Sequence, residues 1–152
     1  MSSARHVTIL IVDDDEGHTE LICRNFRRTG IDNPIESVTS GSEALEYVFR
    51  RGAHANRKED TELLILLDIR MPGSHDGVEV LRRLKSDPQA KTIPVIMLTT
   101  TDDPREVERC YELGCNVYIT KPIESGAFIE AIRRVGLMIS IMSVPTERSR
   151  PA

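Results

Sequence analysis

Acidic side chains stand directly after two apolar runs of this 152-residue chain. The run VTILIV is followed by Asp13, Asp14 and Asp15, and the run ELLILL is followed by Asp68. If the two groups meet in the fold, their carboxylates repel, and each becomes costly to ionise beside the others. A hard divalent cation removes that conflict, and Mg²⁺ prefers one or two carboxylates, water and a phosphate oxygen. Taken singly, each acid fits a helix cap or a turn cap, but together they favour a metal site.

Two further apolar runs end in residues that suit a phosphoryl group. One ends in Thr99, with Thr100 and Thr101 after it, and the other ends in Lys121. Each signal is weak alone, because threonine is common in strands and lysine is common everywhere. An acid cluster, a single acid, a hydroxyl and a lysine, one from each run, make a site for a phosphoryl group on a carboxylate. The metal and the lysine would offset the phosphate charge, and the threonine would donate a hydrogen bond.

The elements that must position these groups alternate along the chain. Apolar or β-branched runs predict strands at 7–12, 34–40, 62–68, 93–100 and 116–120. Helical patterns predict helices at 16–29, 43–52, 77–87, 104–113 and 124–143. Cap signals support the boundaries: Gly30, the capping-box spacing of Ser40 and Glu43, and the pair Asp103-Pro104. The polar segment 53–61 lacks periodicity, which predicts an exposed loop.

Five β–α units with short connections predict an α/β fold, a five-stranded parallel sheet with helices on both faces. The continuous apolar strands (first, third and fourth) should be central and the weaker second and fifth should be edges, which is the flavodoxin-like order 2-1-3-4-5. Ligands of such sheets bind beyond the carboxyl ends of the strands, where the strand order reverses. That point lies between the first and third strands, so the acids after them are expected to meet there.

Composition limits the other functions that the chain could have. Its length suits one domain, predicted over residues 1–145 and including a long C-terminal helix, with a frayed tail at 146–152. The net charge of −4 gives no electrostatic case for nucleic acid. Three cysteines without a C-x-x-C pair fit a reducing cytoplasm. No stretch approaches the roughly 18 apolar residues of a membrane span, so a soluble, cytoplasmic protein without membrane contact is expected.

Five segments, taken in order, resemble the response-regulator receiver domain of two-component signalling: ILIVDDD, LLDIRMP, DGVEVLRRLK, IPVIMLTT and YITKP. The resemblance implies that Asp68 is the phosphoacceptor. It implies that Asp13 and Asp14 form the acidic pair that holds Mg²⁺, for which Mn²⁺ substitutes, with Asp14 as the direct ligand. Asp68 itself and the backbone carbonyl of Arg70 would complete the protein's metal ligands.

The same resemblance assigns the switch. Thr99 would be the switch hydroxyl, Tyr118 the rotating aromatic residue and Lys121 the phosphate partner, with a cis bond to Pro122. Phosphorylation would then alter the face formed by the fourth helix, the fifth strand and the fifth helix. Such a domain promotes its own phosphorylation and dephosphorylation but turns over no external substrate, so it is not expected to be an enzyme in the usual sense.

The partners follow from a narrower resemblance. Segment 53–61, YITKPI and the last helix look like single-domain regulators encoded beside bacterial phytochromes, so the donor is expected to be a sensor histidine kinase of that type. Downstream, direct binding to an effector and phosphoryl relay to a histidine phosphotransfer protein are equally open. One departure concerns the loop 72–77, which has three residues between Pro72 and Asp76-Gly77 where the family usually has two. This enlarges the loop beside the acceptor.

Two enzyme or cofactor classes fit less well. A magnesium-dependent phosphatase of the haloacid dehalogenase type needs a second acid two residues beyond its aspartate, whereas Arg70 stands two residues beyond Asp68. A flavin-binding module needs a hydroxyl- or glycine-rich phosphate loop after the first strand, where this chain has three aspartates. A scaffold-only receiver would lack the acceptor or the lysine, and both are present.

The last helix predicts self-association. One stripe at spacings of four, three, four and three faces the sheet: Phe128, Ile132, Val135, Ile139 and Met142. Five apolar residues lie outside it: Ile129, Leu137, Met138, Ile141 and Val144. A contact under the C-terminal tail is one explanation. The other is an exposed patch that needs a partner, which predicts a homodimer in which two copies pair this helix, 116–120 and 104–113 across a two-fold axis.

Overall fold

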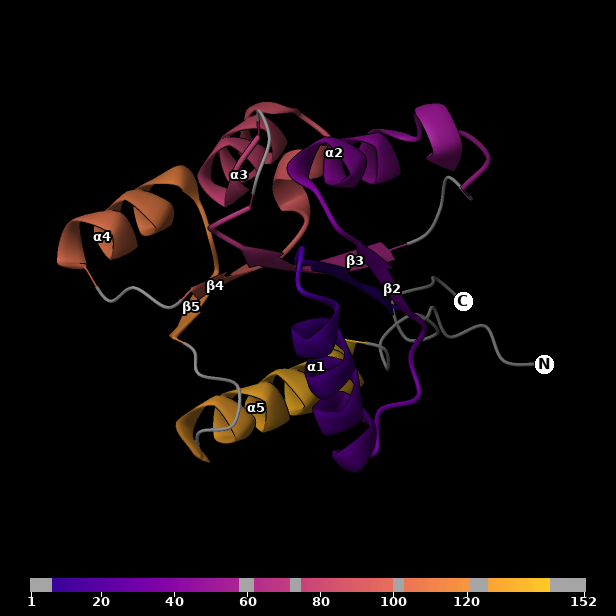
Figure 1. Ribbon diagram of the computed structural model, residues 1–152, viewed down its shortest axis with the longest axis vertical. Coiled ribbons are helices and arrows are strands. Elements are labelled where there is room, and N and C mark those ends of the chain that lie inside the picture. Colours follow the sequence, from indigo (N-terminus) through magenta and orange to yellow (C-terminus); the bar gives the residue numbers. More distant parts are fainter. Residues whose placement is uncertain (1–6, 58–61, 72–74, 100–102, 121–125, 143–152) are drawn as a thin grey trace, which may run out of the picture.

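One parallel sheet with the strand order β2-β1-β3-β4-β5 forms the centre of the molecule (Figure 1). Its strands are β1 (Val7–Val12), β2 (Ile35–Val38), β3 (Glu62–Asp68), β4 (Val95–Thr99) and β5 (Val117–Thr120). All four neighbouring pairs are parallel, so the predicted sheet and strand order are confirmed. The structure is a computed structural model, and it describes residues 7–57, 62–71, 75–99, 103–120 and 126–142.

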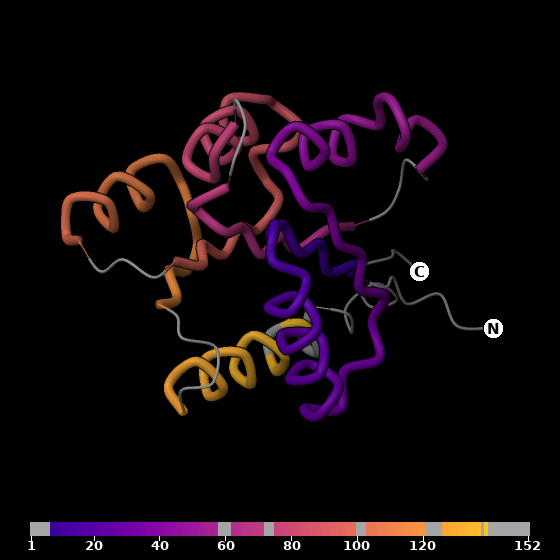
Figure 2. Tube along the Cα trace, in the orientation of Figure 1, coloured from indigo at the N-terminus to yellow at the C-terminus, as the bar shows by residue number. Residues whose placement is uncertain are grey.

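Helices cover both faces of the sheet, as predicted. They are α1 (Glu16–Arg28), α2 (Gly41–Phe49), α3 (Gly77–Ser86), α4 (Pro104–Leu113) and α5 (Gly126–Met142). Figure 2 shows α1 and α5 together on one side, with α2 and α3 on the other and α4 next to α3. Among the described residues, no helix is long and apolar enough to cross a membrane.

The central strands are apolar throughout because both of their faces are covered. All six residues of β1 are buried. Leu10 and Val12 pack into the core under α2 and α3, whereas Val7, Ile9 and Ile11 pack into the core under α1 and α5. The edge strand β2 buries only its last residue, which explains why its sequence pattern is weaker.

Local signals begin α2 and α4 at the predicted caps, whereas α2 ends at Phe49, before its predicted end at Gly52. The side chain of Ser40 accepts a hydrogen bond from Glu43 N (3.1 Å), and that of Asp103 accepts one from Arg105 N (3.0 Å). Gly114 follows α4 with φ +109°. This left-handed conformation is available to glycine without strain, and it ends the helix.

The polar segment that was predicted as an exposed loop is partly structured. A short 3₁₀ turn, η1 (Gly52–His54), opens it. Arg57 then folds back on α2, where its guanidinium donates to Tyr47 O (2.7 Å) and Val48 O (2.9 Å). The last carbonyls of a helix have no partner within the helix, so Arg57 satisfies two of them. Polar composition concealed this role. Residues 58–61 lie outside the described residues.

The predicted inner stripe of α5 is confirmed over the described side chains, because Phe128, Ile132, Val135 and Ile139 are all buried. Ile129 and Leu137 are exposed, with 41% and 56% of their surface accessible. The other predicted members of either set lie outside the described side chains: Met138, Ile141, Met142 and Val144. The predicted tail at 146–152 also lies outside the described residues.

Candidate functional site

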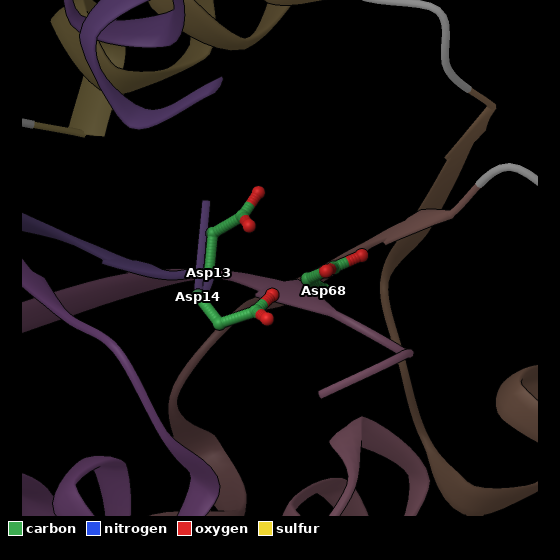
Figure 3. A group of neighbouring side chains, drawn as sticks. All are labelled: Asp13, Asp14 and Asp68. Atoms are coloured by element: carbon green, nitrogen blue, oxygen red, sulfur yellow. The ribbon is translucent and has the colours of Figure 1, made fainter. Parts of the chain in front are cut away.

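The acids after β1 and β3 meet at the carboxyl edge of the sheet. Carboxylate oxygens of Asp13, Asp14 and Asp68 all lie within 4.8 Å of one another (Figure 3). Asp13 and Asp68 are buried, and Asp14 is exposed. The register explains the meeting, because β1 and β3 are neighbours and Val12 pairs with Leu67, one residue before each acid group. The predicted cluster is therefore present.

The third acid of the run after β1 has a different task. The Asp15 side chain accepts a hydrogen bond from His18 N (3.1 Å) and so caps α1. Asp13 turns one oxygen to the Asp15 N–H (2.9 Å). His18 also places its ring Nδ1 3.8 Å from the other Asp13 oxygen. The sequence left cap and metal site as alternatives for these acids, and the structure assigns the cap to Asp15. The approach of His18 to Asp13 was not predicted.

This donor set suits a hard divalent cation. Three carboxylates in so small a space repel one another, and a bound cation offsets that repulsion. Mg²⁺ takes oxygen ligands in octahedral geometry and keeps several waters. One exposed and two buried carboxylates fit this need, because Asp14 leaves the cluster open on its solvent side. The cluster therefore supplies oxygen ligands of the kind that the predicted ion needs, and Asp14 is exposed to solvent.

The first residue of α3 packs closely against the backbone of Asp68. Gly77, the first residue of α3, lies so near that an added Cβ would stand 2.2 Å from Asp68 O and 2.7 Å from Ile69 Cα. Its N–H donates to Ile69 O (2.8 Å). Only glycine permits this approach. The start of α3 therefore supports the backbone of the candidate acceptor directly.

The enlarged loop between β3 and α3 is anchored on α2. His75 Nδ1 lies 3.1 Å from Ser42 Oγ. A Cβ at Gly41 would stand 2.1 Å from His75 O, so glycine is required where the loop crosses the start of α2. His75, at the described end of this loop, is thus anchored on α2. Pro72, Gly73 and Ser74 lie outside the described residues.

Thr99 and Tyr118 are joined beside the cluster. Thr99 ends β4 and is buried, and Tyr118 lies in β5, half-buried. Burial, with a smaller contribution from the charge of Glu106, raises the pKa of Tyr118 to about 12, and a hydrogen bond with the Thr99 side chain opposes this rise. The two predicted switch residues are therefore in contact in this state of the molecule.

The remaining predicted site residues are only partly described. Arg70 follows β3 by two positions, and its side chain is exposed. Lys121 and Pro122 lie outside the described residues, as do Thr100 and Thr101. Thr120, the last residue of β5, pairs in register with Thr99, so β4 and β5 end at the same level of the sheet.

The chain is similar in sequence and structure to response regulator receiver domains. The family model of the response regulator receiver domain matches residues 9–133. The crystal structure of a response regulator receiver domain from Rhodospirillum rubrum is similar, with 45% identity and a TM-score of 0.78 over 91% of this chain and 97% of that one.

Two relatives from cyanobacteria are also similar. Response regulator Rcp1 from Synechocystis is 34% identical over 113 residues, which is 74% of this chain and 75% of Rcp1. The Mn(2+)-bound form of Rcp1 has a TM-score of 0.76 at 28% identity, over 96% of this chain and 99% of that one. The phosphorylated cyanobacterial phytochrome response regulator RcpA has a TM-score of 0.76 at 32% identity, over 86% and 91% of the two chains.

Proposed function

The chain belongs to the response regulator receiver domain family, and on that premise we propose that Asp68 accepts a phosphoryl group from a phosphohistidine of a sensor histidine kinase. The observation that carries the proposal is the gathering of three carboxylates within 4.8 Å at the ends of β1 and β3. An Asp68 oxygen attacks phosphorus, the bond to the histidine nitrogen breaks, and an acyl phosphate remains on Asp68.

Asp13, Asp14 and Asp68, with the Arg70 carbonyl, would hold Mg²⁺, and Mn²⁺ would substitute for it. When bound, the ion supplies positive charge that offsets the charge of the phosphoryl oxygens. The chain's own residues do the rest. The start of α3 fixes the Asp68 backbone, and the Asp15 N–H holds the Asp13 carboxylate in place. We assign to Lys121 the role of the second phosphate partner.

Thr99 and Tyr118 would convert the modification into a changed surface. Thr99 turns to donate a hydrogen bond to the phosphoryl group, and Tyr118 moves into the space that this leaves. Because Tyr118 belongs to β5 and α4 packs beside it, the readout would be the face of α4, β5 and α5. This is a shift between two states, driven by contacts that exist only with the phosphoryl group.

The donor would be a phytochrome-type sensor kinase in the cytoplasm. The support is the likeness to the cyanobacterial phytochrome response regulator RcpA. The product would act either on an effector directly or as an intermediate in a phosphorelay through a histidine phosphotransfer protein. In either case the domain would act on its own Asp68 and on no external substrate.

The acceptor is tested by chemical phosphorylation. Incubation with acetyl phosphate and Mg²⁺ should add one base-labile phosphoryl group, detected by intact-protein mass spectrometry. Asp68→Asn should abolish the label, and EDTA should suppress it. Asp103→Asn is the matched control, because asparagine still caps α4, and it should label like the wild type. Equal labelling of Asp68→Asn and wild-type protein would contradict the assignment.

We further propose the homodimer predicted from the sequence, with its contact at the edge of the sheet on the flank of α5 that faces β5. Exposed Ile129, which the sequence placed in the contact patch, is not among the residues that line this flank and is left out of the contact. A hollow of about 540 Å³ lies between β5 and α5, and its lining includes Val117, Ala127, Ala131 and Val135. An edge strand offers unpaired backbone groups, and an apolar hollow beside it suits a second copy in a two-fold contact. Exposed Tyr111, on α4, extends the same apolar face beyond Tyr118, its ring 6.5 Å from that of Tyr118.

The two flanks of α5 allow a matched test of this dimer. Ala127 is exposed and lines the hollow. Ile129 is also exposed, but it lies two turns before Gly136, which faces Thr29 and Ile31 at the end of α1. In sedimentation at micromolar concentration, we expect a wild-type dimer that Ala127→Glu dissociates and Ile129→Glu does not. A monomeric wild type would refute the dimer, and a dimer unaffected by Ala127→Glu would move the interface elsewhere.

A further inference from the structure

A buried carboxylate oxygen lies on the sheet side of α4. Glu106 is in the first turn of that helix, and its Oε1 atom is buried without a hydrogen-bond partner among the described atoms. Cys110, one turn later on the same side, is completely buried. Buried acceptors are seldom left without a donor, because the lost hydration is not replaced. The Glu106 oxygen therefore needs an explanation.

The neighbours of this oxygen belong to the switch. The Glu106 charge raises the pKa of both Tyr118 and Cys110, as a carboxylate does when it lies near an acid that would become an anion. Tyr118 is at the same time hydrogen-bonded to Thr99. The interface of α4 with β5 thus contains a hydroxyl held by one partner and a carboxylate oxygen that has no partner among the described residues.

We propose that Glu106 is a positioning residue of the switch: its buried oxygen accepts a hydrogen bond from Tyr118 once Thr99 has turned toward the phosphoryl group. The proposal rests on the function proposed above. When Thr99 turns, its bond to Tyr118 breaks, and pairing the phenol with the carboxylate satisfies both groups at once. A hydrogen bond to a carboxylate is stronger than one between neutral groups.

The consequence is a direct link between the modification and α4. Before Thr99 turns, the Glu106 oxygen has no hydrogen-bond partner among the described residues, and its lost hydration disfavours this arrangement. In the activated state it would tie the first turn of α4 to the ring of Tyr118. The face that carries the signal would then be fixed by a bond that forms only after Thr99 has moved.

A double-mutant cycle tests the link, with beryllofluoride and Mg²⁺ as the phosphoryl mimic. Glu106→Met removes the acceptor at similar length, and Tyr118→Phe removes the donor. Each is expected to weaken beryllofluoride binding roughly tenfold, as for one hydrogen bond to a charged group, and the double variant should bind no more weakly than either. Glu106→Gln keeps an acceptor oxygen and should stay within about twofold of wild type, since neutral acceptors also bind hydroxyls.

A purely structural Glu106 would behave differently. A Glu106 that only stabilises the N-terminus of α4 through its charge would make Glu106→Gln and Glu106→Met weaken beryllofluoride binding equally. The effect of Glu106→Met would then be the same with and without Tyr118→Phe. Either result overturns the proposal. Should Glu106→Met not fold, Glu106→Ala takes its place in the cycle. A wild-type protein that fails to bind beryllofluoride would overturn the function proposed above and this inference with it.

Discussion

The contact of Gly77 with the backbone of Asp68 gives a prediction about both stability and function. Alanine at position 77 would place its Cβ 2.2 Å from Asp68 O. Nonbonded atoms rest at roughly 3.5 Å, so the oxygen or the first turn of α3 must move by about 1.3 Å. The blocking atoms belong to the backbone of β3, which is buried and paired on both sides, so no flexible side chain can absorb the movement.

The expected cost follows from that displacement. Overpacking in a dense interior typically costs about 1–3 kcal/mol, and the gain of alanine over glycine in a helix, about 1 kcal/mol at most, offsets part of it. We expect Gly77→Ala to lower the free energy of unfolding by roughly 1–2 kcal/mol. For a chain of this length that is a fall in Tm of roughly 2–8 °C. Because the displaced oxygen belongs to the acceptor, acyl-phosphate formation from acetyl phosphate should also slow several-fold.

Another helix start provides the control. Gly126 is the first residue of α5, just as Gly77 is the first residue of α3, but an added Cβ there meets no atom of the described residues within 4 Å. Thermal unfolding by circular dichroism should therefore show Gly126→Ala at or slightly above the wild type. If Gly77→Ala proved as stable as Gly126→Ala and labelled at the wild-type rate, the end of β3 would not be held as rigidly as the packing implies.

Three further predictions concern the core, a helix end and alkaline pH. Phe128→Ala should cost about 3–5 kcal/mol in urea unfolding because the ring is completely buried, whereas the exposed Leu137→Ala should stay within about 0.5 kcal/mol. Arg57→Lys should lower the free energy of unfolding by about 1 kcal/mol, since an ammonium does not reproduce the two hydrogen bonds of the guanidinium to the end of α2. An unchanged midpoint of urea unfolding would show that Arg57 does not stabilise the end of α2. Burial raises the pKa of Cys110 and of Cys115 from 9.0 to about 11, so the folded chain keeps protons that the unfolded chain releases. Stability should be full below about pH 9 and fall toward pH 11, and replacing both cysteines with alanine should flatten that fall.

The strands, the helices and the strand order could be predicted because each depends on the residue types of a whole segment and not on the position of a single side chain. A strand buried on both faces must be apolar throughout, so VTILIV and ELLILL indicated central strands without any knowledge of their neighbours. Strand order then followed from which runs were weakest. The meeting of Asp13 and Asp14 with Asp68 needed only this topology, because parallel neighbours end at the same edge of the sheet.

What could not be predicted depends on where single atoms lie after packing. Three consecutive aspartates are chemically alike, and only the path of the chain into α1 decides that Asp15 accepts from His18 N while its predecessors face Asp68. Arg57 lies in a segment whose polarity predicted exposure to solvent, yet its guanidinium donates to two carbonyls at the end of α2.

The role of Glu106 in the switch could not be predicted from the sequence for the same reason. Its place in the first turn of α4 is typical of an acid that favours a helix N-terminus, and nothing in the spacing of residues distinguishes it from such an acid. The difference is that one of its oxygens is buried against the sheet without a partner among the described atoms. Local propensity and tertiary packing thus give this residue two roles at once. The role in the switch requires Tyr118, whereas the stabilisation of the helix N-terminus does not. A substitution that preserves α4 but removes the acceptor oxygen therefore separates the two roles.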